Sequence, residues 1–456
     1  MGWLDRFKRK GKKVVVIGLD GTPYSLVSRL VAEGKMPHFA DLLKEGTMRP
    51  MNSVLPTVSS VAWSSFMTGK NPGKHGIYGF IDRVPDSYKT YIPTSKNMQS
   101  ETLWEILSRH GRRVVVINVP VTYPPRKVNG IVVAGFLSPS LGKATYPPSV
   151  AQELREMGYI IDVDPWRARE SKDQLLEDLD RALEKRAEAM FRFMDREPWD
   201  FLICHIMETD RLHHFLWEQM EKGDEKYGPA FFAFYRKIDD VLGQVAERLD
   251  EDTTLIVMSD HGFCTLKREV NVNYWLRERG YLRFRKEPPE TSASSVEPSL
   301  ADIHPDSVAY SLIPGRIYVN LRGREPRGCV EPGRSYLEVR ERLAGELLEM
   351  RDPDTGERMV ERVMKREEVY SGPCYEQAPD LVVVPLRGYD LKGGLKKESL
   401  TCNGVIVGMH TYDDAMLYVT GGVLARENLE VIDVMPMILN LMDVHMPDDV
   451  DGVITD

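Results

Sequence analysis

Two hydrophobic patterns alternate along most of the chain. Short runs of β-branched and other apolar residues, such as 14–17, predict buried strands. Longer segments between them repeat apolar residues at helical spacing. The alternation predicts an α/β protein with a largely parallel sheet. The predicted strands are 13–19, 113–118, 130–135, 200–206, 254–258 and 380–385. The predicted helices are 24–34, 37–45, 60–68, 101–110, 149–157, 172–193, 229–249, 336–350 and 431–442.

One region interrupts this alternation. Residues 284–306 are rich in Pro, Glu and Ser, which predicts a surface loop, with a mobile lid as one interpretation. Residues 307–378 predict a small α+β subdomain. We therefore expect one core formed by 14–283 and 379–456, with the loop and the subdomain inserted over 284–378.

The composition is that of a soluble globular enzyme, with 42% hydrophobic and 28% charged residues in 456. A net charge of −9 argues against affinity for a nucleic acid polymer. The five cysteines are widely spaced, which favours reduced thiols and a cytoplasmic protein over a disulfide framework. We find no apolar stretch of about 18 residues, so no transmembrane helix is expected.

The first 13 residues form a basic tail with six basic residues and one acid. The tail lacks the apolar region of a signal peptide. One interpretation is a solvated, frayed terminus. The other is a weak peripheral contact with an anionic membrane, at its inner face, through the basic residues together with Trp3, Leu4 and Phe7.

Metal-ligand types of residue stand at the ends of apolar runs and on helical stretches. Asp20 ends the run 14–19, and Asp260 with His261 follows the run 255–259. The carboxyl ends of parallel strands lie at one edge of a sheet, where two buried acids would be costly without a cation. Seven residues together would suit two divalent metals and a nucleophile: Asp20, Ser59, Asp210, His214, Asp260, His261 and His410.

The helical candidates are less specific when each is taken alone. Asp210 and His214 are spaced i, i+4, so on a helix they share a face and suit one metal. His213 points elsewhere and is a candidate to support the ligands. Each pattern also has a structural interpretation, such as a solvated helix face or a packed histidine, and His410 gains weight only as a member of the set.

Hydroxyl groups precede the predicted helix 60–68. Thr57, Ser59 and Ser60 are each suited to be a helix cap. They are equally suited to be a nucleophile whose phosphoryl oxygens bind the free N–H groups of the first helical turn. Chemistry alone does not choose among the three.

With these motifs the chain resembles the alkaline phosphatase superfamily, and more closely its type I phosphodiesterase/nucleotide pyrophosphatase branch and predicted phosphohydrolase/phosphomutase proteins. The resemblance implies an alkaline-phosphatase-like three-layer αβα sandwich with a mostly parallel central sheet and a small α+β insertion. The stretches that carry it are 17–21, 68–69 with 71–77, 210–214, 259–263, 408–410, and 433–436 with 446–452.

The resemblance also implies a role for each ligand. Asp20, Asp260 and His261 would hold the metal that binds the nucleophile, and a second metal would be bound by Asp210, His214 and His410. Counting back ten residues from Gly69 places the nucleophile at Ser59, while Thr57 would be two residues too early. Zinc is the expected metal, and the mixed Asp/His sets would also accept manganese.

The chain departs from the branch at one position. Nucleotide pyrophosphatases carry an Asn three residues after the nucleophile, where this chain has Ala62. Other groups must then orient the phosphoryl oxygens. We expect the substrate-binding residues to be Ser60 and, from the loop 118–125, Asn118, Thr122 and Tyr123, although a rigid Pro-rich connection would explain that loop equally well.

The sequence therefore predicts a two-metal-dependent phosphohydrolase of small-molecule phosphate esters, with phosphodiesters or pyrophosphates favoured and a seryl-phosphoryl intermediate. One alternative is a phosphomonoesterase or phosphomutase with the same site. A monoester dianion needs more positive charge, for which Lys70, Lys74 and Arg211 are candidates. A more remote alternative is a non-catalytic, metal-binding, membrane-associated scaffold.

Overall fold

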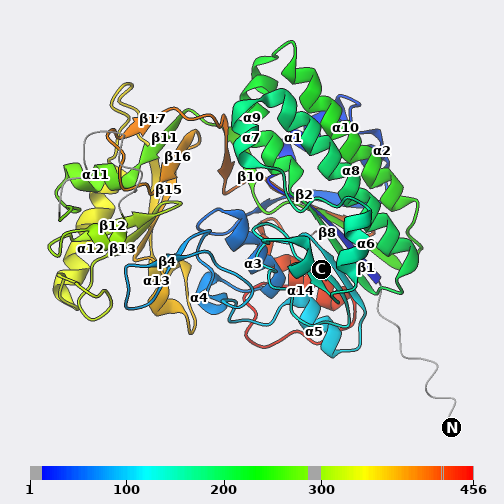
Figure 1. Ribbon diagram of the computed structural model, residues 1–456, viewed down its shortest axis with the longest axis horizontal. Coiled ribbons are helices and arrows are strands. Elements are labelled where there is room, and N and C mark those ends of the chain that lie inside the picture. Colours follow the sequence, from blue (N-terminus) through cyan, green and yellow to red (C-terminus); the bar gives the residue numbers. More distant parts are fainter. Residues whose placement is uncertain (1–12, 286–298, 423, 425, 455–456) are drawn as a thin grey trace, which may run out of the picture.

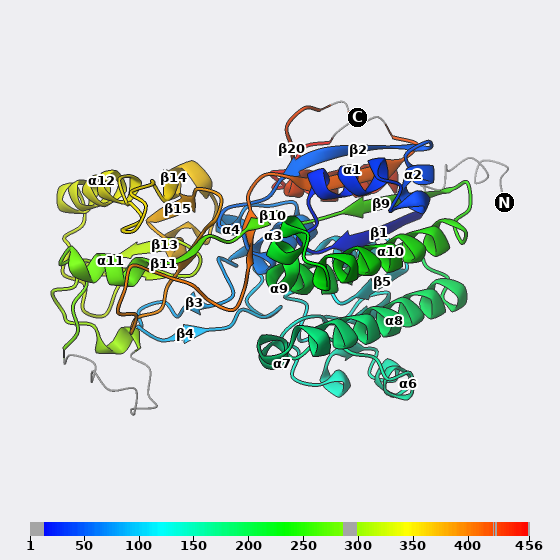
Figure 2. The ribbon, with the colours of Figure 1, turned by 90° about the horizontal axis from the view of Figure 1, so that it is seen from above.

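The computed structural model describes residues 13–285, 299–422, 424 and 426–454. The basic tail lies outside these residues apart from Lys13, and so does most of the predicted lid at 284–306. Among the described residues, no helix combines the length and apolar character needed to cross a bilayer. Figures 1 and 2 show a large core beside a smaller lobe.

A nine-stranded sheet forms the centre of the core, in the order β20-β2-β19-β9-β1-β8-β5-β6-β7. The five strands from β9 to β6 are parallel, as predicted, and antiparallel pairs flank them on both sides. The strands are β1 (Lys13–Leu19), β2 (Gly46–Asn52), β5 (Val114–Ile117), β6 (Gly130–Val133), β7 (Thr145–Tyr146), β8 (Phe201–Ile206), β9 (Thr253–Met258), β19 (Ala415–Thr420) and β20 (Leu429–Glu430).

Helices cover both faces of this sheet, which confirms the predicted three-layer αβα sandwich. Alternate residues of β1 point to opposite faces: Val15 and Ile17 to one core, Val14 and Val16 to the other. Near the first face lie α1 (Tyr24–Ala32), α2 (Pro37–Leu42), α6 (Val150–Glu156), α7 (Pro165–Glu170), α8 (Lys172–Arg196), α9 (Glu208–Lys222) and α10 (Tyr227–Ala246). On the other are α3 (Ser59–Thr68), α5 (Leu103–Arg109) and α14 (Val434–Leu441), with the short α4 (Pro72–His75) beyond α3.

The smaller lobe has its own hydrophobic core and two sheets, in the orders β12-β13-β15-β14 and β16-β11-β17. Its strands are β11 (Arg268–Asn271), β12 (Ala309–Leu312), β13 (Arg316–Val319), β14 (Val360–Lys365), β15 (Leu381–Pro385), β16 (Tyr389–Lys392) and β17 (Thr401–Cys402). Its helices are α11 (Val272–Glu278), α12 (Arg334–Leu348) and α13 (Arg366–Val369).

The lobe is larger than the interval 284–378 that the sequence predicted. The predicted strand at 380–385 forms as β15, but it pairs with β13 and β14 rather than with the central sheet. β11 and α11 also belong to the lobe, because Val270 and Trp275 pack in its core. The lobe therefore begins before the expected boundary at 283 and ends after the one at 379. The sequence did not show this, because an apolar run alone does not indicate which sheet it joins.

Two short antiparallel strands stand where the chain leaves the core for the lobe and where it returns. β10 (Gly262–Thr265) precedes the lobe and β18 (Gly408–Thr411) follows it, and the two pair with each other. A segment from the core, with β3 (Asp82–Arg83) and β4 (Thr90–Tyr91), also packs against the lobe, where Asp82 lies 2.5 Å from the buried Arg316. Both pairs of strands thus help to hold the lobe to the core.

Candidate active site

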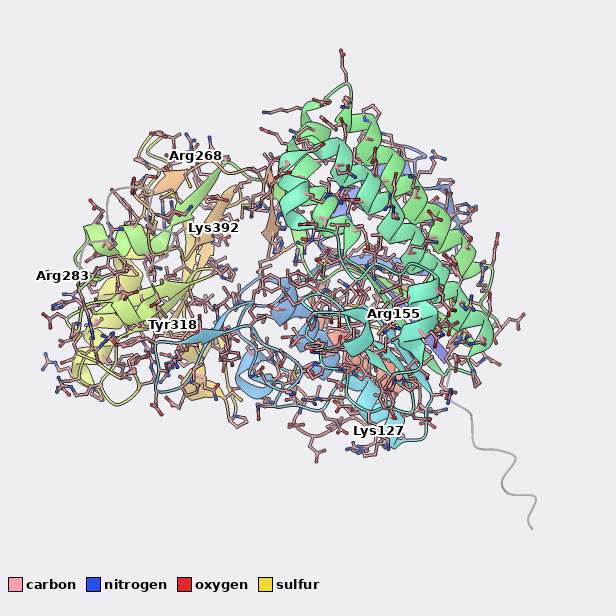
Figure 3. The ribbon with its side chains drawn as sticks, viewed as in Figure 1. Lys127, Arg155, Arg268, Arg283, Tyr318 and Lys392 are labelled. Atoms are coloured by element: carbon pink, nitrogen blue, oxygen red, sulfur yellow. The ribbon has the colours of Figure 1, made fainter. Side chains whose placement is uncertain are left out.

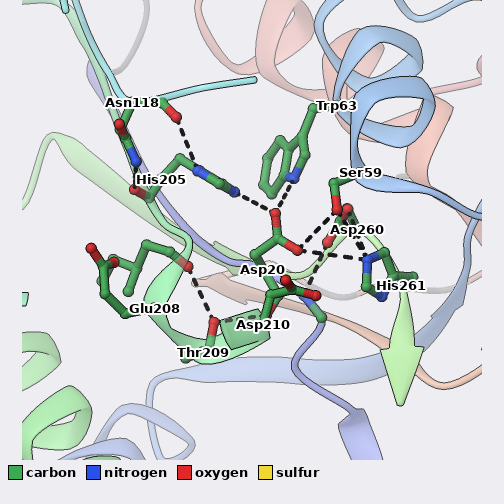
Figure 4. A network of polar contacts seen from close by, with 12 residues as sticks. Asp20, Ser59, Trp63, Asn118, His205, Glu208, Thr209, Asp210, Asp260 and His261 are labelled. Carbon is green, nitrogen blue, oxygen red and sulfur yellow. Dashed lines mark hydrogen bonds and ion pairs between the residues drawn. The ribbon is translucent and has the colours of Figure 1, made fainter. Parts of the chain in front are cut away.

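The first predicted metal set lies where two neighbouring strands of the central sheet end. Asp20 follows β1, and Asp260 with His261 follows β9, which pairs with β1 in parallel. The three side chains are buried, and their ligand atoms lie within 4.8 Å of one another (Figure 4). The structure therefore brings together the first three residues that the sequence singled out.

Two neighbouring side chains hold the Asp20 carboxylate in place. Its Oδ2 accepts hydrogen bonds from His205 Nε2 at 2.7 Å and from Trp63 Nε1 at 3.1 Å. The indole fits because position 18 is Gly18, where a Cβ would come within 2.5 Å of the Trp63 ring. Burial acts to raise the pKa of Asp20, but the hydrogen bond and charge of His205, with His261, hold it below its ordinary value. Asp20 is therefore an ionised carboxylate with Oδ1 directed into the site.

Asp260 and His261 have the contacts expected of cation ligands. Asp260 Oδ1 accepts from the Gly21 N–H at 3.1 Å, while Oδ2 is buried with no hydrogen-bond partner among the described residues. Burial and the charge of Asp20 hold the pKa of Asp260 well above its ordinary value, so its ionised form lacks a counter-charge. His261 Nδ1 lies 3.0 Å from the Gly262 carbonyl, which assigns the proton to Nδ1 and the lone pair to Nε2.

The second predicted set joins a helix of the core to the strand that returns from the lobe. Asp210 and His214 lie one turn apart on α9, and His410 lies on β18. Pairing of β10 with β18 sets His410 opposite Phe263, two residues beyond His261. The two sets adjoin, because the rings of His261 and His410 stack with centroids 3.8 Å apart.

Nitrogen and oxygen atoms converge in this second set. His410 Nε2 lies 3.1 Å from both Asp210 Oδ1 and His214 Nε2. The His214 Nδ1 faces the Gly408 carbonyl at 3.0 Å, which leaves its Nε2 lone pair directed at the other two residues. Burial lowers the pKa of His214, which favours the neutral ring. Two imidazole nitrogens and a carboxylate oxygen at this spacing suit a divalent cation.

The residues present thus fit two divalent cations. In the first set, a carboxylate oxygen of Asp260 has no hydrogen-bond partner among the described residues and lies beside a second carboxylate, that of Asp20. In the second set, the Nε2 atoms of His214 and His410 face each other. Both sets combine carboxylate and imidazole, a donor chemistry that zinc and manganese accept. The residues assigned to each set are Asp20, Asp260 and His261 in one, and Asp210, His214 and His410 in the other.

Of the three candidate nucleophiles, Ser59 is the one whose hydroxyl contacts ligand side chains of the first set. It is the first residue of α3, and its Oγ lies 3.2 Å from Asp20 Oδ1 and 3.3 Å from His261 Nε2. The Thr57 hydroxyl instead donates to the Val54 carbonyl at 3.1 Å. Ser60 is buried, with no hydrogen-bond partner for its Oγ among the described residues. The geometry therefore favours Ser59 among the three candidates.

Sequence reasoning missed a supporting layer behind the ligands. His205 lies in the middle of the buried β8 and donates to Asp20, while its Nδ1 lies 3.0 Å from the Asn118 carbonyl. Thr209 donates to the Asp20 carbonyl at 2.7 Å. A histidine inside an otherwise apolar strand was the available signal, because a buried imidazole needs a polar partner. His213 does lie behind the site, with Nδ1 3.0 Å from the Gly21 carbonyl.

Two of the residues predicted to bind substrate, Asn118 and Thr122, have other contacts. Asn118 is buried behind His205, with a left-handed φ of 65°, and the Thr122 hydroxyl donates to the Val119 carbonyl at 2.6 Å. These contacts give both a structural role in the loop. Binding of substrate by Ser60, Asn118, Thr122 and Tyr123 stays a prediction.

A cavity of about 1070 Å³ opens beside the second set, between the core and the lobe. His214, His410 and Arg211 line it. Arg211 is already held by Asp162, 2.7 Å away. The other two predicted cations lie elsewhere and bond to acids near the C-terminus: Lys70 to Asp449 and Lys74 to Asp451. Of the three, Arg211 is thus the one placed to act in this cavity.

Comparisons with known proteins show what the chain is similar to. Residues 14–413 match the family described as type I phosphodiesterase/nucleotide pyrophosphatase. GPI ethanolamine phosphate transferase 3 of Eremothecium gossypii is 34% identical over 71 residues, which are 15% of this chain and 6% of that protein. The catalytic subunit from Homo sapiens is 33% identical over 91 residues, 19% of this chain and 7% of its own. The chain thus matches only a small part of these curated relatives.

Solved structures share the fold at low identity. Phosphonoacetate hydrolase from Sinorhizobium meliloti has a TM-score of 0.65 at 17% identity, with 95% of this chain and 96% of that chain covered. Murine ectonucleotide pyrophosphatase/phosphodiesterase 5 has a TM-score of 0.56 at 16% identity, covering 97% and 98%. The alkaline phosphatase PafA has a TM-score of 0.60 at 14% identity, covering 98% of each chain.

Proposed function

Because the chain belongs to the type I phosphodiesterase/nucleotide pyrophosphatase family, we propose that it is a two-metal-dependent hydrolase that cleaves phosphodiesters or pyrophosphates through a seryl-phosphoryl intermediate on Ser59. The family and its alkaline phosphatase superfamily fold establish a phosphate-ester enzyme in outline. Zinc is the proposed metal and manganese the alternative. A small-molecule phosphate ester is the proposed substrate.

The observation that carries the proposal is the position of the Ser59 hydroxyl. It lies within 3.3 Å of both Asp20 and His261, at the first turn of a helix, and beside a second set of ligands. A serine placed only to cap α3 would have no need of two buried ligand-type residues. The arrangement supports a nucleophile within reach of both sets.

Each residue has a part in the proposed reaction. Two bound metal ions would supply Lewis-acid chemistry, lowering the pKa of the serine hydroxyl and offsetting charge on the phosphoryl oxygens. Ser59 Oγ forms a bond to phosphorus as the bond to the leaving oxygen breaks. Water then cleaves the Oγ–P bond and regenerates Ser59. Throughout, His205 and Trp63 hold Asp20 in place.

The first turn of α3 is proposed to orient the phosphoryl group. Ala62 offers no polar side chain, and the N–H groups of Val61 and Ala62 both bond to the Val58 carbonyl. The Ser60 N–H is therefore the proposed donor, and the N-terminal end of the helix dipole favours the anion. The Ser60 N–H would then take the place of the Asn that nucleotide pyrophosphatases carry at the position of Ala62.

The three cations that the sequence offered for a monoester do not favour one. A monoester dianion needs more positive charge than a diester monoanion, yet Lys70 and Lys74 pair with Asp449 and Asp451 away from the cavity. Arg211 is already shared between Asp162 and Asp210, at 2.7 and 3.7 Å. A monoesterase or phosphomutase is therefore the second candidate.

The proposal is tested with metal-replete protein on bis-p-nitrophenyl phosphate and p-nitrophenyl phosphate. We expect faster hydrolysis of the diester, and a loss of at least about a thousandfold in kcat for Ser59→Ala. Thr57→Ala is the matched control and should change kcat by less than about fivefold. A monoester preference would favour the second candidate, and activity that survived Ser59→Ala would exclude the seryl intermediate.

A further inference from the structure

The cavity between core and lobe carries an excess of basic side chains in an acidic protein. The whole chain has a net charge of −9, yet the cavity is lined by seven Arg or Lys residues and four Asp or Glu residues. Much of the remaining wall is apolar, with Ile313, Pro314, Val382 and Leu386 contributed by the lobe. A wall of this kind suits an anionic ligand whose charged groups are joined by an apolar part.

The lobe strand β16 directs two of these charges into the cavity. Tyr389 and Leu391 are buried in the lobe core, so strand alternation turns Asp390 and Lys392 to the opposite face. Both line the cavity, and their side chains are 21% and 27% exposed. Figure 3 shows Lys392 on the side of the lobe that faces the core.

The ammonium group of Lys392 is charged and has donor capacity to spare. Burial acts to lower its pKa, but the charge and hydrogen bond of Asp390, 2.5 Å away, hold the pKa above its ordinary value. Glu269 lies at 3.8 Å, beyond hydrogen-bonding distance. An ammonium has three N–H donors, so binding of one carboxylate leaves capacity for another anion.

Other groups place Lys392 between the second ligand set and a further cation of the core. The charges of His410 and His214 act on the pKa of Asp390, after burial and Lys392, so the Asp390–Lys392 pair lies within electrostatic range of that set. The charge of Arg169, from α7, acts to lower the pKa of Lys392, and Arg169 lines the same cavity. Two cations carried by different parts of the molecule thus line one cavity.

We infer that Lys392, with Arg169 of the same cavity, forms a subsite for a second anionic group of the substrate, a carboxylate or a phosphate, beyond the phosphoryl group that reacts. Both residues line the same cavity, and an anion bound there would be attracted by both positive charges. The inference rests on the proposed function, since it places the reacting phosphoryl group at the two ligand sets. It makes the lobe a determinant of substrate choice.

The test measures binding rather than turnover. Calorimetric titration of metal-replete protein compares phosphonocarboxylates of increasing chain length with alkylphosphonates of the same length. One chain length should bind roughly tenfold more tightly with the carboxylate than without it. Lys392→Gln should abolish this preference and leave alkylphosphonate affinity unchanged, whereas Lys397→Gln, an exposed lysine of the same lobe, should leave both unchanged. Asp390→Asn should increase the preference, because it removes the competing carboxylate.

Three results would overturn the subsite. They are an equal loss of affinity for both kinds of ligand in Lys392→Gln, no preference for a second carboxylate or phosphate at any length, and a preference that survives Lys392→Gln. A phosphonate carrying a second phosphate separates the two candidate anions, since its preference should exceed that of the carboxylate if a phosphate is the natural group. Hydrolysis of bis-p-nitrophenyl phosphate is measured beside the titration. A carboxylate preference without hydrolysis would support the subsite and reject the proposed hydrolase.

Discussion

The two ligand sets differ in burial and in origin, although each contains three residues. In the first, the side chains of Asp20, Asp260 and His261 are at most 1% exposed. In the second, His214 and His410 are 18% and 17% exposed and line the cavity. The first set comes from two adjacent strands of one sheet, whereas the second needs a strand that returns from the lobe.

This difference indicates that the two ligand sets have different roles. The first set is surrounded by neighbours that fix its ligands, including His205, Trp63 and the Gly21 N–H, and it contacts Ser59, the proposed nucleophile. The second set meets the cavity in which substrate would enter and leave. The first set is thus a rigid inner site and the second set a more accessible outer site. We expect the two to respond differently to mutation, chelation and acid.

The largest effect is expected from the inner site. Asp260→Asn removes a ligand charge while keeping the side-chain shape, so activity should fall about ten thousandfold. The metal-free variant should be no less stable than the metal-free parent, because a buried carboxylate with a raised pKa is replaced by a neutral amide. Thermal unfolding with and without metal measures both effects. A variant that stayed active would remove Asp260 from the metal site.

A smaller, reversible effect is expected at the outer site. His410→Ala should lower activity about a hundredfold, with partial recovery at high metal concentration, because Asp210 and His214 remain. Metal analysis should show one ion per chain where the parent holds two. His304→Ala, at an exposed position in the lobe, is the control. Loss of both ions together in His410→Ala would contradict the division between the sites.

A substitution behind the inner site should have a smaller effect again. His205→Gln weakens the hold on Asp20 without removing a ligand, which predicts a loss of about ten- to a hundredfold in metal affinity. The outer site should keep its affinity. Competition with a chromogenic chelator separates the two sites, and equal weakening of both would refute the supporting role of His205.

The smallest effect is expected from acid. Burial, together with the charge of His410, lowers the pKa of His261 to about 3, so protons compete weakly for the inner site. Burial acts to lower the pKa of His410, but its hydrogen bond to the Asp210 carboxylate and the charge of that carboxylate raise the pKa above its ordinary value. Falling pH should therefore remove metal from the outer site first. The metal affinity of this site should fall about tenfold for each pH unit below the pKa of His410. Metal content after buffer exchange at each pH provides the measurement.

The sequence predicts local features of this molecule better than distant ones. β1, β8 and β9 follow from their apolar runs, and the acids after β1 and β9 meet because parallel strands end at one edge. Even the pairing of Asp210 with His214 follows from helical spacing. The resemblance to the family, now confirmed, supplied the order of the ligands and the choice of Ser59.

Long-range pairing was beyond such reasoning. Nothing in the local pattern shows that β10 pairs with β18, which is how His410 reaches Asp210. The apolar run of β15 has the same appearance as a strand of the central sheet, yet it belongs to the lobe. Register between strands far apart in sequence depends on the whole packed structure, and so do supporting contacts such as the one between Trp63 and Asp20.

The late position of β18 in the chain has a consequence for synthesis. A ribosome makes Asp20, Ser59, Asp210 and His261 long before it reaches His410, and chains generally fold from the N-terminus as they emerge. The inner ligands are therefore present while the outer site still lacks its third residue. Until the lobe has been made and the strand after it has returned, the nascent chain holds an incomplete pair of sites. Completion of the lobe thus sets the moment at which a new molecule first becomes competent for catalysis.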